Sequence, residues 1–203
     1  MGSQILTTGV PGGARAEGEA RSAGASVALA AASTLAQCGA LVRSASPEAY
    51  GAPSAILPGG TIGKHVRHTV DHYRAIVDRE AGACIDYDRR ERDVPMETER
   101  EAAIAEIEQL VGVVRGLDGA ALAAPVRVRV MLTGDGGEAE LESTVGREIA
   151  FAAHHAVHHQ AMLRAIAVEH GVEAPAGFGK APSTMEYERC AHERGGFGPG
   201  AGR

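Results

Sequence analysis

The chain has 203 residues and a formal net charge of -6, and 44% of its residues are hydrophobic, which suits one domain with a sizeable core. Its 20 lysines and arginines are interspersed among 26 aspartates and glutamates, so no basic stripe exists to neutralise phosphates, and we expect no nucleic-acid partner. The three cysteines are odd in number and far apart, which fits a reducing, cytoplasmic setting better than a disulfide framework.

The two ends of the chain lack the composition of a packed core. Residues 1–23 are rich in Gly, Ala and Glu without an aromatic residue, and residues 193–203 are rich in Gly. Such segments bury little apolar surface, so we predict a disordered N-terminal segment and a flexible C-terminal tail. The single predicted domain therefore covers residues 24–192.

The first predicted helix covers about residues 24–44, where apolar residues recur at steps of three and four. Its apolar run at 26–42 is too short to span a membrane, contains Gln37 and begins too far from the N-terminus for a standard signal peptide. We therefore expect no membrane partner. A loop with three prolines, residues 45–60, follows the helix.

A second helix is predicted from near Thr61 to about Arg79, with one apolar arc. The charged stretch DYDRRERDVP that follows is expected to be a loop. A third helix is indicated by Thr98 and Glu101, whose spacing is typical of a capping box, and it fades at Gly116.

After the third helix the apolar pattern changes from helical steps to alternation. Apolar residues occupy every second position over residues 126–132 and again over residues 139–141, and the segment TGDGGE between them is typical of a turn. This pattern predicts a β-hairpin. A fourth helix, about 144–170, ends at Gly171. The predicted fold class is all-α, an antiparallel four-helix bundle with a β-hairpin inserted before the last helix, and the core of such a bundle can hold a site.

Seven of the nine histidines lie on two predicted helices, the second and the fourth: His65, His68, His72, His154, His155, His158 and His159. His155 and His159 fall within about 40° of each other on the stripe that faces the core. Buried imidazoles need partners for their nitrogens, and this spacing delivers two nitrogens to one metal ion. His154 falls outside the stripe, whereas His158 lies near its edge and is a candidate for supporting a ligand.

Helical spacing leaves the third ligand open. His65 and His72 lie nearer the apolar arc than His68 does, so periodicity indicates one of the three. Three histidine ligands would leave an open coordination position, as catalytic metal ions require. The alternatives are a histidine-rich helix surface, or a structural site closed by Glu148 or Asp71.

The chain resembles the DinB-like superfamily of four-helix-bundle metalloenzymes, which includes bacillithiol- and mycothiol-dependent transferases and the N-terminal domain of ergothioneine-type sulfoxide synthases. Two blocks carry the resemblance, TIGKHVRHTVDHY at 61–73 and HHAVHHQAM at 154–162. Two further segments, at 85–98 and 178–189, are similar to a subgroup, and the similarity runs over residues 26–192.

Laid on the family pattern, His68 matches the helix-two ligand, and His155 and His159 match the paired ligands. The resemblance implies a Zn²⁺, Ni²⁺ or Fe²⁺ ion and an enzyme, a transferase or hydrolase, that acts on a small molecule. In thiol-dependent members a low-molecular-weight thiol would bind the open position and attack an electrophile. The alternative is a non-catalytic metal-binding bundle with a structural or stress-response role.

Two residues of the charged stretch, Tyr87 and Arg90, are candidate substrate-binding residues. An arginine pairs well with a carboxylate or a phosphate, although a charge run of this kind is more often a solvated loop. An exposed face of the bundle would also allow a homodimer.

Overall fold

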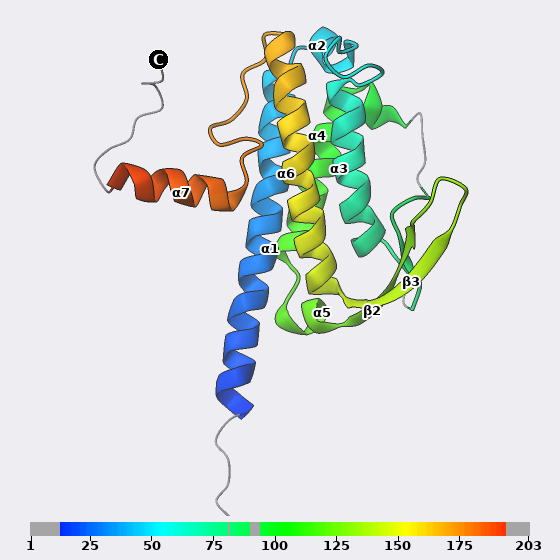
Figure 1. The fold of residues 1–203 in the computed structure, drawn as a ribbon, viewed down its shortest axis with the longest axis vertical. Coiled ribbons are helices and arrows are strands. Elements are labelled where there is room, and N and C mark those ends of the chain that lie inside the picture. The colour runs from blue at the N-terminus through cyan, green and yellow to red at the C-terminus, as the bar shows by residue number, and fades with distance from the viewer. Residues whose placement is uncertain (1–12, 81, 90–93, 194–203) are drawn as a thin grey trace, which may run out of the picture.

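The computed structural model describes residues 13–80, 82–89 and 94–193 (Figure 1). The protein is mostly helical and carries one small three-stranded sheet. Its four long helices are α1 (Gly13–Ser44), α3 (Ile62–Val77), α4 (Arg100–Arg115) and α6 (Val145–Glu169). α1 contacts α4 and α6, and α3 contacts the same two helices, so the four pack around a shared interior.

The hydrophobic core lies between these four helices. Each buried branched side chain contributes roughly 1.5–3 kcal/mol relative to an exposed one, so the shared interior is the main source of stability. The largest wholly buried side chains on these helices include Leu35, Leu41, Ile62, Tyr73, Ile76, Ile107, Ile149, Leu163 and Ile166.

Helix α1 begins at Gly13, ahead of the predicted start near residue 24. Within it, Ser26–Ser44 is long and apolar enough to cross a membrane, which corrects the expectation that this run is too short. In this structure 44% of the stretch is buried within the protein, and α1 contacts α4 and α6. Core helices of soluble proteins and signal sequences near an N-terminus satisfy the same criterion of length and apolarity, so this stretch is weak evidence for a membrane span.

Helix α3 begins where the sequence predicts, because the Thr61 hydroxyl accepts a hydrogen bond from the Lys64 backbone N–H at 3.0 Å. The predicted capping box before α4 is wrong. A 3₁₀ turn, η1 (Pro95–Glu97), ends at Thr98, whose own N–H donates to the Pro95 carbonyl. Thr98 therefore lacks the extended backbone of a cap, and Glu99 precedes α4 without a side-chain cap.

The predicted hairpin is confirmed, and the sheet has one strand more than expected. Strands β2 (Pro125–Met131) and β3 (Glu138–Thr144) pair antiparallel, whereas β1 (Ile85–Asp86) pairs parallel with β2. The charged stretch expected as a loop therefore begins with a strand. Two residues are too few to produce a readable alternation, so the pattern could not predict β1.

Three shorter helices were also absent from the sequence prediction: α2 (Pro47–Gly51), α5 (Gly119–Ala123) and α7 (Pro182–Glu193). α2 lies inside the predicted loop, where the Ser46 hydroxyl accepts from the Ala49 N–H and a proline occupies the first turn. α7 buries none of its residues and projects from the side of the protein (Figure 1). The predictions for residues 1–12 and 194–203 lie outside the described residues.

Candidate metal centre

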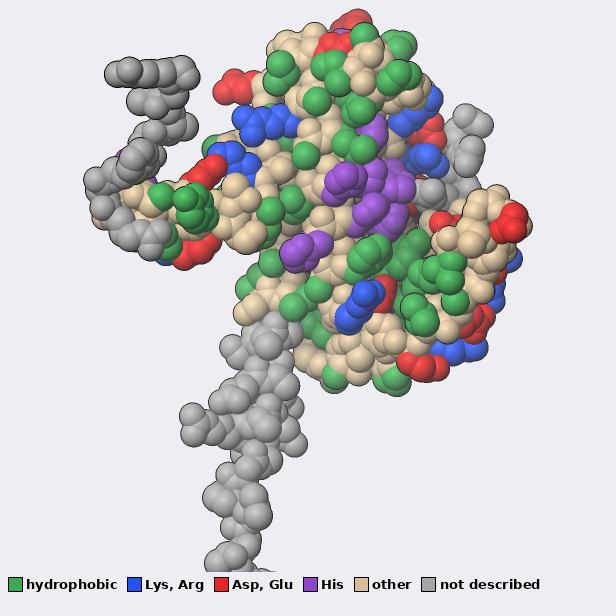
Figure 2. Space-filling view, in the orientation of Figure 1, with side chains coloured by type: hydrophobic (Ala, Val, Ile, Leu, Met, Phe, Trp, Pro, Cys, Tyr) green, Lys and Arg blue, Asp and Glu red, His purple; other side chains and the backbone are tan. Residues whose placement is uncertain are grey.

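Helices α3 and α6 contact each other and bring six histidine rings together, and the exposed part of this group forms a patch on the surface (Figure 2). The ring centroids of neighbouring members lie between 4.2 and 6.2 Å apart. We call this group the histidine cluster; it consists of His65, His68, His72, His155, His158 and His159. Both helices are needed, because neither supplies more than three of these rings.

The nitrogen atoms of three rings converge at the centre of the cluster. The Nε2 atom of His155 lies 3.0 Å from Nε2 of His68 and 3.1 Å from Nε2 of His159. Zinc binds imidazole nitrogens at about 2.0–2.1 Å, so two such ligands at angles between 90° and tetrahedral are about 3.0–3.4 Å apart. Both spacings around His155 therefore suit pairs of ligands on one divalent ion, and a set of imidazoles suits Zn²⁺, Ni²⁺ and Fe²⁺ alike.

His72 offers a second way to complete the same site. One nitrogen each from His68, His72 and His155 lie within 4.8 Å of one another. The Nδ1 atom of His72 lies 2.9 Å from the backbone carbonyl of His68 and can donate to it, which leaves Nε2 with a lone pair. His68 and His155 are thus common to both sets, and His72 or His159 is the third member.

His65 lies behind His159. Their Nδ1 atoms are 3.3 Å apart, so a proton on one of these nitrogens can be shared with the other. The other nitrogen of His65 points toward the loop, because a Cβ added at Gly60 would lie 3.1 Å from it. His65 is therefore placed to orient the ring of His159, a role that second-layer partners of metal-binding histidines commonly have.

The surroundings of two cluster members, His65 and His159, disfavour their protonated forms. Burial, followed by the neighbouring imidazoles of His155 and His65, lowers the pKa of His159 to about 3. Burial also lowers the pKa of His65 below its usual value. Since a metal ion binds only the unprotonated nitrogen, the same crowding that disfavours the imidazolium makes the lone pairs available.

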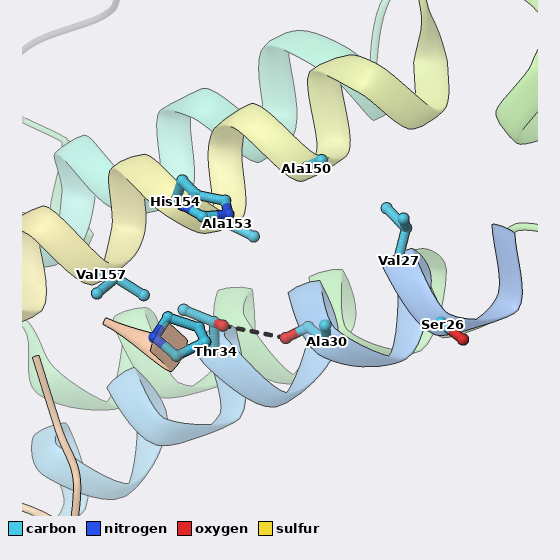
Figure 3. A pocket seen from close by; sticks show the side chains of 9 residues that line it. Ser26, Val27, Ala30, Thr34, Ala150, Ala153, His154 and Val157 are labelled. Atoms are coloured by element: carbon cyan, nitrogen blue, oxygen red, sulfur yellow. Dashed lines mark hydrogen bonds between the residues drawn. The ribbon is translucent and has the colours of Figure 1, made fainter. Parts of the chain in front are cut away.

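His154 belongs to a different part of the surface. Its side chain is exposed and lines a hollow of about 270 Å³ between α1 and α6, together with small residues such as Ala30 and Ala153 (Figure 3). This agrees with its predicted position outside the core-facing stripe. His158 is also exposed, and it lies at the edge of the histidine cluster, with its ring centroid 5.3 Å from that of His159.

Tyr87 lies against the cluster. Its ring stacks on His72 with centroids 5.0 Å apart, and its hydroxyl donates to Oε2 of Glu148 at 2.7 Å. Burial raises the pKa of Tyr87, and the hydrogen bond to Glu148 raises this pKa further. The tyrosine therefore stays protonated and holds its ring flat against the imidazole. Arg90, the other predicted substrate-binding residue, lies outside the described residues.

The two carboxylates considered as closing ligands are engaged elsewhere. Glu148 accepts from Ser143 at 2.6 Å and from Arg147 at 2.7 Å, in addition to Tyr87. Burial alone would raise the pKa of Glu148, but these hydrogen bonds outweigh it and the pKa is lowered. Asp71 lies 3.6 Å from the guanidinium of Arg67 on its own helix.

The aromatic contacts of the cluster were only partly visible in the sequence. Phe151 lies on the same α6 stripe as His155, and its ring stacks on that imidazole with centroids 5.7 Å apart. The pairing of Tyr87 with Glu148 joins residues 61 positions apart in the chain. The spacing of residues within one helix or strand cannot predict a contact between residues so far apart in the chain.

Comparison with known proteins gives a relative and a family. The protein named "FK506-binding protein 5" from Rhizopus delemar is 32% identical over 104 residues, which are 51% of this chain. The chain spans 27% of that relative's length. No solved structure matches the chain. The family model of the DinB superfamily matches residues 31–163, a span that includes all six members of the histidine cluster, and the chain therefore belongs to the DinB superfamily.

Proposed function

We propose that the protein is a metal-dependent enzyme that acts on a small molecule, with a divalent ion held by His68, His155 and His159. The observation that carries the proposal is that the Nε2 atom of His155 lies 3.0 Å from that of His68 and 3.1 Å from that of His159. The described carboxylates nearest in sequence, Glu148 and Asp71, have other partners, which leaves a coordination position for water or substrate.

The proposal includes the architecture of the family. The contacts of α1 and α3 with both α4 and α6 support an antiparallel four-helix bundle, with the metal ion between α3 and α6. The hydrophobic core extends along all four helices and does not depend on the histidine cluster. The chain should therefore fold without the ion.

The chemistry would be transferase or hydrolase chemistry. A bound ion lowers the pKa of water or a thiol at its open position and so supplies a nucleophile at neutral pH. His65 would orient the ligand His159 through the contact between their Nδ1 atoms, and Tyr87 would fix the neighbouring ring of His72 by stacking on it. A low-molecular-weight thiol is one reactant that would suit the open position.

The competing proposal is a metal-binding bundle without catalysis, and His72 is the residue that favours it. If its Nε2 binds together with the other three imidazoles, four protein ligands close the site, as in structural zinc sites. The protein would then use the ion for stability alone.

The experiment that separates the two uses the full chain loaded with Co²⁺, whose visible absorption reports coordination number and exchangeable ligands. We expect about one ion per chain, a spectrum that changes on adding a small anion or thiol, and helical circular dichroism that persists after chelation. A spectrum that no added ligand changes, together with unfolding on chelation, would establish the structural role instead.

The third ligand is tested by comparing His159→Ala with His72→Ala. We expect stoichiometric metal to be lost from the first variant and retained by the second. The reverse result would assign the ion to His68, His72 and His155.

A further inference from the structure

A largely apolar hollow lies beside the histidine cluster. It has a volume of about 280 Å³ and is formed between the β2–β3 hairpin and the first turns of α6. The hairpin contributes Val128, Val130 and Leu141 to its lining, and the opposite side includes Tyr87 and Phe151. We call it the hairpin hollow.

The hairpin hollow and the histidine cluster share two aromatic side chains. Tyr87 stacks on His72 at 5.0 Å with the ring planes 14° apart, and Phe151 stacks on His155 at 5.7 Å with 17° between planes. Figure 2 shows hydrophobic side chains adjoining the histidine patch on the side of the hairpin. These two rings contact the cluster and also line the hollow, so the two sites adjoin each other.

The buried charge in the wall of the hollow is already compensated. Glu148 accepts hydrogen bonds from Tyr87, Ser143 and Arg147. The guanidinium of Arg147 donates to this carboxylate and lies 5.6 Å from the ring centre of Phe151. Arg147 neutralises Glu148, and the one other charged lining residue, Glu142, is an exposed carboxylate, so the lining disfavours an anion and its apolar part favours an uncharged group.

We propose that the hairpin hollow binds an uncharged apolar group of the substrate, an aryl or short branched alkyl group, while the polar reacting atom occupies the open position of the metal ion. This inference rests on the proposed function. Size supports an aryl group, because an apolar cavity of about 150 Å³ is enough for benzene. The substrate class is therefore a small molecule with one metal-binding atom and one apolar arm.

The test compares two thiols that differ only in a phenyl group, ethanethiol and 2-phenylethanethiol, on the Co²⁺-loaded full chain. The thiolate-to-cobalt absorption band measures the affinity of each. Burying about 60 Å² of the phenyl group corresponds to roughly tenfold tighter binding, so we expect 2-phenylethanethiol to bind about tenfold more tightly.

A hairpin variant assigns that preference to the hollow. Leu141→Asp places a charge in the lining at a side chain that is 56% exposed, so the fold should tolerate it. We expect the preference for the phenyl thiol to fall to within about twofold, since the charge disfavours burial of an apolar group. The matched control is Leu132→Asp on the same hairpin, a 67% exposed residue outside the lining, which should keep the full preference.

The outcomes separate this inference from the proposed function. Equal affinity for the two thiols, or a preference that Leu141→Asp leaves unchanged, would overturn the apolar site and leave the open metal position intact. A failure of both thiols to produce the charge-transfer band would overturn the open position and, with it, the inference built on it.

Discussion

The two sides of helix α6 carry histidines in unlike surroundings. On the side that faces α3, His155 and His159 have imidazole nitrogens of α3 residues within 3.3 Å. On the side that faces α1, His154 is exposed and lines a hollow formed with small residues of both helices. Histidines on one side of α6 therefore belong to the candidate site, whereas the histidine on the other side is an exposed surface residue.

This difference shows that the candidate site is identified by histidine nitrogens that meet across two helices. The number of histidines on one helix does not identify it. Four histidines lie within six consecutive positions of α6, yet the ones that gain nitrogen neighbours are those opposite histidines of α3. Opposite α1 the polar contacts are of another kind: the buried Gln160 amide donates to the Thr34 carbonyl and to the Cys38 sulfur. These contacts join helices and offer no ligands.

The largest effect should come from the central imidazole. We expect His155→Ala to reduce metal content from about one ion per chain to near zero, because its Nε2 lies within 3.1 Å of the Nε2 atoms of both His68 and His159. His154→Ala, one position away, should keep full metal content. Elemental analysis of the purified variants measures the metal content of each. Equal metal content in the two variants would contradict the assignment of the site to the α3-facing side of α6.

A smaller effect is expected from the ring behind the ligands. His65→Leu removes the nitrogen 3.3 Å from Nδ1 of His159, and loss of such an orienting contact typically weakens metal affinity about 10–100-fold. Competition with a chelator of known affinity measures the change. The control is His158→Leu at the exposed edge of the cluster, and comparable weakening in both variants would contradict a specific role for His65.

The smallest expected effect is a decrease in the free energy of unfolding at alkaline pH, and it comes from Cys38 of α1, which contacts the α1-facing side of α6. Burial raises the pKa of the Cys38 thiol to about 11, although its hydrogen bond with Gln160 opposes this. The unfolded thiol ionises near pH 9.0, so between pH 9 and 11 the unfolded state binds fewer protons and the free energy of unfolding decreases as the pH rises. The loss should reach about 2–3 kcal/mol.

Urea unfolding at a series of pH values tests this prediction, with Cys38→Ala as the matched variant. The difference between the two proteins isolates Cys38 from the buried tyrosines, whose pKa values are raised as well. If the free energy of unfolding fell equally with pH above 9 in the unsubstituted protein and in Cys38→Ala, the Cys38 thiol would not be the titrating group.

Much of the fold was predictable because long helices repeat their pattern many times. The stripes of α3, α4 and α6 each cover several turns, and the alternation of β2 and β3 covers seven residues per strand, so their types were correct. The short elements were missed, since the five residues of α2 and the two of β1 span too few periods for a repeat to be recognised. The capping box failed because a 3₁₀ turn already uses the Thr98 backbone.

The sequence by itself determined that His155 and His159 share one face of a helix, because an i, i+4 spacing on a helix has only one geometric outcome. It determined equally that His154 lies outside that face. Only the tertiary structure decided which α3 nitrogens lie beside His155, since that depends on how α3 is rotated and shifted along α6. The helical wheel favoured His65 or His72, and His72 is indeed the most buried of the three, but packing brings His68 within 3.0 Å of His155. The same packing joins Tyr87, His72 and Glu148, and no local pattern along the chain encodes the relative placement of three separate elements.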